Sequence, residues 1–177
     1  LGKASHPVTL ALQSLLNDFN LAEELLQEII DGMEMDLDIQ HYANFKELSL
    51  YCYRAASVVG LLSAEIFGFK NRDTLKYAHD LGMAFQLTNI LRDVREDAER
   101  GRVYLPQDEL EKFGVTRQDL TQPVTSDSLQ ALFQFQAERA RDYYKKAFNE
   151  LPDEDRYAQR AGLIMAEIYQ SLLDEIE

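Results

Sequence analysis

Apolar residues recur at helical spacing along nearly the whole chain, and no segment alternates in the way that predicts a β-strand. Between residues 21 and 40, for example, Leu25, Ile29, Met33 and Leu37 follow one another at four-residue steps. The pattern predicts a single all-α domain over residues 1–177, built as a helical bundle with short loops. The expected helices span residues 7–19, 21–40, 45–67, 74–99, 107–113, 126–151 and 154–177.

Glycine, proline and capping residues mark where these helices start and stop. Gly68 and Gly114 follow the ends of two helices, and Pro152 breaks a third. Asp73 is expected to cap the helix that begins at Thr74. The other predicted breaks are an extended segment at residues 102–106, before and at Pro106, and a surface loop at residues 121–125 around Pro123.

The most informative segment is the helix expected at residues 74–99, where polar side chains form a stripe on a mostly apolar cylinder. At roughly 100° per residue, Gly82, Gln86, Asn89, Asp93 and Asp97 fall within a stripe roughly 80° wide. A helix that is apolar on most sides is buried, and buried amides and carboxylates need partners. The apolar positions around this stripe are Leu81, Met83, Ala84, Phe85, Leu87, Ile90, Leu91 and Val94.

Asn89, Asp93 and Asp97 carry three side-chain oxygen donors on one helix face, at successive four-residue steps. Such ligands suit Mg²⁺, a hard cation that keeps several waters and is shared with substrate phosphates. Arg92, one residue off the stripe, carries the planar fork suited to diphosphate oxygens. The spacing predicts a Mg²⁺ site for a diphosphate. A solvated, salt-bridged helix end is the competing interpretation for Asp97, because charged residues crowd positions 95–100.

Composition narrows the choice of partners. The net charge of −13 argues against nucleic-acid binding, because an acidic surface repels phosphate backbones. The single cysteine, Cys52, excludes an internal disulfide and a cysteine-based zinc site, and it fits a reducing cytoplasm. No targeting segment is visible, and the apolar stretch at residues 55–69 is too short and, with Glu65, too polar to span a bilayer.

Two further groups of residues are expected to serve the fold. Small side chains on one side of the helix at residues 45–67 favour close helix packing over a ligand pocket. Basic side chains on the helix at residues 126–151 are expected to form a solvated face, with a membrane-surface role as the alternative. The small residues are Ala56, Gly60, Ser63 and Ala64, and the basic ones are Arg139, Arg141, Lys145 and Lys146.

Three motifs together resemble the squalene/phytoene synthase family, whose members are head-to-head trans-prenyltransferases. The motifs are Tyr51-Cys-Tyr-Arg-Ala-Ala-Ser-Val-Val-Gly60, Gln86-Leu-Thr-Asn-Ile-Leu-Arg-Asp-Val-Arg-Glu-Asp97 and Gly101-Arg-Val-Tyr-Leu-Pro106. The second is similar to the family's second aspartate-rich motif. Residues 28–37 and 108–114 look most like the bacterial presqualene diphosphate synthases of hopanoid biosynthesis, and the resemblance weakens after about residue 120.

The resemblance implies the isoprenoid-synthase helical bundle with a central apolar cavity. It implies a reaction that joins two farnesyl diphosphates into presqualene diphosphate, with Mg²⁺ as the cofactor. Asn89, Asp93 and Asp97 would be the metal ligands by analogy, and Gln86 and Arg92 would contact the prenyl diphosphate. The remaining implied residues are Tyr51, which would face the reacting carbons, and Tyr169, which resembles a tyrosine near the family's C-terminal substrate contacts.

The departures from the family pattern concern the start of the chain. The family's first aspartate-rich motif lies on an early helix and binds metal opposite Asp93, and no counterpart precedes Tyr51 here. Asp31, Glu34 and Asp38 share one helix face but do not lie at the position of that motif. The chain therefore resembles a synthase that lacks its N-terminal helices, and we expect the 177 residues alone to be inactive.

Other functions stay open from the sequence. One is phytoene synthase acting on geranylgeranyl diphosphate, which cavity depth would distinguish. Another is a catalytically silent family member that acts as an assembly factor, although such relatives tend to lose the acidic motif that Asp93 and Asp97 preserve here. A plain helical scaffold is the last, and it predicts no use for Gln86 and Asn89 in a buried stripe. We expect a cytoplasmic protein, with peripheral membrane contact for release of a greasy product as an addition.

Overall fold

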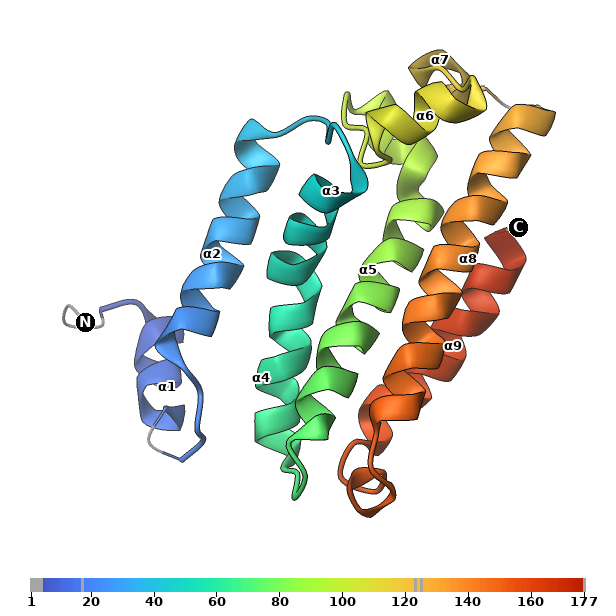
Figure 1. The fold of residues 1–177 in the computed structure, drawn as a ribbon. Helices are drawn as coiled ribbons and strands as arrows, with labels where there is room; N and C mark the ends of the chain where they lie inside the picture. The colour runs from blue at the N-terminus through green and yellow to red at the C-terminus, as the bar shows by residue number, and fades with distance from the viewer. Residues whose placement is uncertain (1–4, 17, 123, 125, 177) are drawn as a thin grey trace.

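The computed structural model describes residues 5–16, 18–122, 124 and 126–176, and its only regular elements over that part of the chain are helices. Figure 1 shows α2, α3 with α4, α5 and α8 lying side by side, with α9 against α8. The all-α expectation is confirmed. The α-helices are α1 (Pro7–Leu15), α2 (Glu23–Asp38), α3 (Phe45–Cys52), α4 (Val58–Phe67), α5 (Asp73–Glu99), α6 (Gln107–Phe113), α7 (Arg117–Thr121), α8 (Asp127–Glu150) and α9 (Arg160–Ile176).

The helix expected at residues 45–67 is interrupted by a π-helical turn, η1 (Tyr53–Ser57), which joins α3 to α4. The turn lies where two helices approach closely. A Cβ on Gly32 of α2 would lie 2.8 Å from the Arg54 Cβ, and one on Gly82 of α5 would lie 2.5 Å from the Ser57 Cα. Both glycines therefore allow backbone contact at this turn, and π-turns of this kind are frequent at functional sites.

α5 is the central helix of the bundle, and its start differs from the prediction. The N-cap position is Arg72, and Asp73 is the first helical residue, with its carboxylate bonded to Lys76 Nζ at 2.8 Å. The capping prediction for Asp73 was therefore wrong. The carboxylate that closes this end is Asp155, which accepts hydrogen bonds from the Thr74 hydroxyl and from two backbone amides just before the helix.

The chain around η2 (Asp153–Asp155), a 3-10 turn, also departs from expectation. The last helix starts at Arg160, six residues later than predicted, because the residues before it hold Asp155 against α5. α1 likewise ends at Leu15, short of the predicted residue 19. The predicted loop at residues 121–125 begins with the last residue of α7, and Pro123 and Thr125 of that loop lie outside the described residues.

The other breaks agree with the prediction. Ser126 caps α8, since its hydroxyl accepts a bond from the Leu129 amide. Gly114 ends α6 at φ +67°, a left-handed conformation that glycine adopts without strain. The extended segment before Pro106 is confirmed by an isolated parallel bridge between Val103 and His41.

One continuous helix of the described part, Phe45–Phe67, has the length and composition to cross a membrane, with a mean hydropathy of 1.2. The sequence-based expectation considered only residues 55–69 and judged that stretch too short. Core helices of soluble proteins pass the same test, so this one helix is weak evidence for a membrane span. In the fold this helix packs against α2 and α5.

Candidate active site

The polar stripe on α5 borders a cavity of about 380 Å³ that lies between α4, α5 and α9. Gly82, Gln86 and Asn89 of the stripe all line this cavity. Among the residues described, the Asn89 side-chain oxygen is buried and has no hydrogen-bond partner. A buried acceptor without a partner costs roughly 1–3 kcal/mol, so this oxygen is available to a water or a ligand in the cavity.

The cavity wall is mostly apolar, which suits a hydrocarbon. Ala56 on η1 and Gly60 and Ser63 on α4 belong to this wall, so the expectation that they favour close packing over a ligand pocket was wrong for these three. Gly60 serves both purposes, because a Cβ there would lie 2.5 Å from the Ala78 carbonyl oxygen of α5. The larger apolar side chains in the wall are Val59, Phe67, Leu81, Phe85 and Met165.

Asp93 is half-exposed and bonded on both carboxylate oxygens by its neighbour Arg92. The Arg92 Nε and Nη2 groups donate to Asp93 at 2.7 and 2.6 Å. These hydrogen bonds hold the pKa of Asp93 below its usual range, although partial burial opposes them. The pKa of the Arg92 guanidinium is raised, first by Asp93 and further by Tyr169. Tyr169 also lines the cavity, so the structure brings the two predicted substrate contacts together.

Asp97 follows one turn later and is partly buried. Burial raises its pKa first, and the charge of Asp93 raises it further, while Arg100 and Arg102 oppose the shift. The pKa shift of Asp97 is therefore opposite to that of Asp93, whose carboxylate is neutralised by Arg92. Both interpretations of Asp97, as a metal ligand and as part of a solvated helix end, stay predictions.

Tyr51 lies in a buried cluster of tyrosines instead of in the cavity wall. Its hydroxyl donates to Asp36 on α2 at 3.1 Å, and the Tyr104 hydroxyl donates to the other Asp36 oxygen at 2.7 Å. The rings of Tyr51 and Tyr104 stack at 5.2 Å, and Tyr42 packs against both. Asp36 supplies the acceptor that a buried phenol needs, and Tyr51 is not among the residues that line the cavity. That Tyr51 faces the reacting carbons stays a prediction.

Asp36 and Arg102 are the site neighbours that the sequence interpretation missed. Asp36 lies on a different face of α2 from Asp31 and Asp38, and that face directs its side chain toward Tyr51. Arg102 Nη2 donates to the Asp36 backbone oxygen at 2.7 Å, and the Arg102 charge lowers the pKa of Asp97. The motif at residues 101–106 was the available signal for Arg102.

Comparison with known proteins settles the family. The family model for squalene/phytoene synthase matches residues 1–177. The chain belongs to the squalene/phytoene synthase family. It is 39% identical to the 15-cis-phytoene synthase of Synechococcus elongatus over 99% of this chain and 61% of that protein. It is 40% identical to the phytoene synthase of Mycobacterium tuberculosis over 96% of this chain and 57% of that protein. The chain thus spans about three fifths of the length of these relatives.

Solved structures of the family share the fold. A dehydrosqualene synthase in complex with ligand superposes with a TM-score of 0.84 at 31% identity, over 97% of this chain and 60% of that one. Squalene synthase HpnC from Alicyclobacillus acidocaldarius superposes with a TM-score of 0.87 at 26% identity, over 99% and 66%. The predicted isoprenoid-synthase bundle is confirmed by these likenesses.

The oxygen donors on α5 can supply only part of the coordination shell of a magnesium ion. The described residues hold no cluster of three or more histidine, cysteine, aspartate or glutamate side chains able to bind a metal. The available donors are the carboxylates of Asp93 and Asp97 and the unpartnered oxygen of Asn89. All are hard oxygen donors, and Mg²⁺ typically uses one or two carboxylates with waters and phosphate oxygens. The residues present therefore fit a shared magnesium site.

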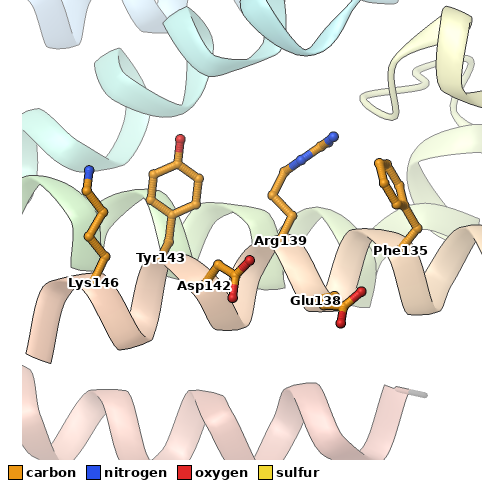
Figure 2. Close-up of a pocket in the computed structure, with 6 residues that line it drawn as sticks. All are labelled: Phe135, Glu138, Arg139, Asp142, Tyr143 and Lys146. Atoms are coloured by element: carbon orange, nitrogen blue, oxygen red, sulfur yellow. The ribbon is translucent and has the colours of Figure 1, made fainter.

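A second hollow lies along α8, where Arg139, Tyr143 and Lys146 point away from α9 (Figure 2) and the two basic side chains are already paired with acids. Arg139 is paired with Glu109 and lies over the Phe45 ring, and its side chain is 17% exposed. The expectation that Arg139 belongs to a solvated face was wrong. The other basic residues of this helix also pair with acids: Arg141 with Asp174, Lys145 with Asp142 and Lys146 with Asp80. Membrane contact through this face stays a prediction.

Proposed function

We propose that the protein carrying this chain joins two farnesyl diphosphates head to head to give presqualene diphosphate, releasing one diphosphate and one proton. The observation that carries the proposal is the buried, unpartnered oxygen of Asn89, which lies between the carboxylates of Asp93 and Asp97 and an apolar cavity. A polar end beside a greasy wall matches a substrate with a charged head and a hydrocarbon tail. Family membership supports the reaction class.

Arg92 is the side chain that receives the diphosphate. Its guanidinium is 42% exposed, so it can leave Asp93 for a substrate oxygen without crossing packed residues. In this exchange the Arg92 guanidinium gives up the Asp93 carboxylate for the substrate diphosphate. The diphosphate carries more negative charge and accepts the same two N–H bonds, so the exchange is favourable. Once Arg92 has turned away, both oxygens of Asp93 are free for another ligand. Tyr169, which lines the cavity, lies near enough to Arg92 to raise the pKa of its guanidinium.

Asn89, Asp93 and Asp97 are the residues that would hold Mg²⁺. The ion would supply positive charge against the diphosphate as it leaves the allylic carbon. The raised pKa of Asp97 agrees with this role, because a bound cation would offset the repulsion from Asp93.

The cavity wall protects the carbocation that forms when the allylic bond breaks. Phe85 and Leu81 line the stretch below Gln86 and keep water from the cation, which water would otherwise quench to an alcohol. The Phe85 ring packs 4.8 Å from the Tyr169 ring, so two aromatic faces border the charged end. Aromatic faces stabilise nearby positive charge. Gln86 is placed to hold the substrate head through its amide.

Tyr51 is assigned a role through its hydrogen bond. Its hydroxyl is held by Asp36, and burial together with Tyr104 and Asp36 raises its pKa far above the usual range. A phenol held in this way keeps its own proton at neutral pH. We therefore assign Tyr51 to positioning through Asp36, ahead of proton removal.

Phytoene synthesis from geranylgeranyl diphosphate is the second candidate, because the two curated relatives described above are phytoene synthases. Both reactions use the same polar end and differ in the length of the tail. A silent assembly factor is disfavoured, because Asp93, Asp97 and the unpartnered Asn89 together form a site that such a protein would not need.

The test is product identification. The full-length protein is incubated with Mg²⁺ and either farnesyl or geranylgeranyl diphosphate, without a reductant, and products are identified by mass spectrometry. Presqualene diphosphate from the shorter substrate supports the proposal, and a C40 product from the longer one alone supports the second candidate. If no diphosphate is released with either substrate, the enzyme assignment is wrong.

A further inference from the structure

A buried tyrosine lies at the end of the cavity remote from Asn89, and it belongs to none of the sequence motifs described above. Tyr77, on the first turns of α5, lines the cavity and is 2% exposed. Its hydroxyl has no hydrogen-bond partner within the described part of the chain, and burial raises its pKa to about 12. Gln159 lines the same end and is fixed there, because its Nε2 donates to the Gly68 backbone oxygen at 3.0 Å.

Gly162 on α9 makes room for this tyrosine. A Cβ at Gly162 would lie 2.7 Å from the Tyr77 hydroxyl oxygen and 3.4 Å from Leu81 Cδ2. The first separation is shorter than a Cβ contact tolerates, so any larger residue would displace the phenol. The tyrosine and the glycine therefore form one fitted pair that ends the cavity.

The distance along α5 from the polar end to this pair matches a particular tail length. Tyr77 precedes Asn89 by twelve residues, which at 1.5 Å per residue places them about 18 Å apart along the helix axis. From ordinary carbon–carbon bond lengths, an extended farnesyl tail spans roughly 14 Å and a geranylgeranyl tail roughly 19 Å. The shorter tail is shorter than this separation, and the longer one exceeds it.

We infer that Tyr77, supported by Gly162, sets the prenyl chain length by forming the floor of the cavity, and that it excludes the fourth isoprene unit of a C20 substrate. This inference rests on the proposed function, because it takes the cavity to hold the prenyl tail. Tyr77 is then a specificity residue: it meets the end of the tail, far from the reacting carbons.

The first test measures kcat/KM of the full-length enzyme for farnesyl and geranylgeranyl diphosphate. The wild-type enzyme prefers the C15 substrate. Tyr77→Ala raises the C20-to-C15 ratio by about tenfold or more, since one methylene alone discriminates about tenfold in an apolar pocket. The matched control is Leu132→Ala, which truncates a fully buried leucine of α8 outside the cavity wall and leaves the ratio unchanged. An unchanged ratio in Tyr77→Ala, or a wild type that prefers C20, overturns the inference.

The second test makes the cavity shallower instead of deeper. Gly162→Ala pushes the phenol into the cavity, so it lowers thermal stability and lowers the C20-to-C15 ratio further. Adding Tyr77→Phe removes the hydroxyl that collides with the new methyl group and restores the stability of Gly162→Ala. Because these variants keep a ring at position 77, the test stands even if Tyr77→Ala fails to fold. Failure of Tyr77→Phe to rescue Gly162→Ala contradicts the fitted pair.

A binding measurement separates this inference from the proposed function. If the wild-type enzyme turns over neither substrate, the proposed function fails. The role of Tyr77 in limiting the tail length is then tested by the affinities of unreactive thio-diphosphate analogues with C15 and C20 tails. Tighter binding of the C15 analogue, lost in Tyr77→Ala, supports the floor. Equal binding of both analogues to the wild type contradicts it.

Discussion

The two ends of α5 hold carboxylates in opposite states. At the start of the helix, Asp155 is 1% exposed and fully engaged, with bonds of 2.7–3.0 Å from the Thr74 hydroxyl and from the amides of Lys70 and Asn71. Burial alone would raise its pKa, but these bonds outweigh burial, and the pKa is lowered. Toward the other end, Asp97 has a raised pKa, and the Asn89 oxygen has no partner among the described atoms.

The difference shows which acid serves the fold and which serves a ligand. A buried carboxylate whose acceptors are all used by the protein has nothing left to bind. Asp97, which is half-buried with a raised pKa and lies on the same helix face as the unpartnered Asn89 oxygen, has its binding capacity in reserve. Removing Asp155 should therefore affect stability, and removing Asp93 should affect activity.

The largest expected effect is on activity. Asp93→Asn should lower turnover of the full-length enzyme by about 10² or more, because a ligand to the leaving diphosphate's counter-ion is lost. Helix content and Tm should not change, since Asp93 makes only an exposed ion pair with Arg92. Glu99→Gln, an exposed acid on the same helix, is the control. Retained activity in Asp93→Asn would remove Asp93 from the site.

Asp155→Ala should have the largest effect on stability. Three hydrogen bonds at about 1 kcal/mol each predict a loss of about 3 kcal/mol in the free energy of unfolding. Urea unfolding followed by circular dichroism measures it, with the exposed Asp153→Ala as the control. Equal stability of the two variants would show that Asp155 does not hold the start of α5.

Asn89→Leu should separate stability from function at one residue. Replacing an amide whose buried oxygen has no partner with an apolar side chain of similar size should leave stability unchanged or raise it by up to about 1 kcal/mol, while activity is lost. Thr88→Val is the matched control. The Thr88 hydroxyl bonds the Ala84 carbonyl and Tyr144, so its loss should cost about 1 kcal/mol with activity kept. A destabilised Asn89→Leu would indicate a protein partner for the amide.

The smallest expected effect concerns folding stability, to which Asp155 and Asp97 contribute with opposite dependence on pH. Asp155 has a lowered pKa, so its contribution to stability is present above the unfolded value near 3.9 and is lost as the pH falls through the folded value. Asp97 has a raised pKa, so wild type should gain stability relative to Asp97→Asn as the pH falls from neutral. Unfolding curves from pH 7 to 3 for wild type, Asp155→Asn and Asp97→Asn measure both. Equal slopes of the free energy of unfolding against pH for the three proteins would contradict the contrast between Asp155 and Asp97.

Local patterns predicted most of the helices, because each depends on spacing and on residues at its own ends. The signal for α7 was present and overlooked, since Thr116 and Asp119 form a capping box at the spacing that precedes a helix. The π-turn at Tyr53–Ser57 carries no comparable signal. It depends on backbone contacts with Gly32 and Gly82 from two other helices.

The candidate site was predicted only as far as one helix could specify it. The stripe placed Gln86 and Asn89 correctly, because the period of α5 decides which side chains share a face. The bond between Asp155 and Thr74 joins residues 81 positions apart, and nothing local indicates it. Arg92 and Asp93 are adjacent, and side chains one residue apart do not ordinarily face each other, so their pairing was also unexpected.

The most direct test of the account is calorimetric titration of the full-length protein with inorganic diphosphate, with and without Mg²⁺. The account predicts that binding requires Mg²⁺ and disappears in Asp93→Asn and Asn89→Leu, while Asp155→Asn, in its folded state, binds as the wild type does. Diphosphate binding that is indifferent to Mg²⁺, or that survives in Asp93→Asn, would contradict it.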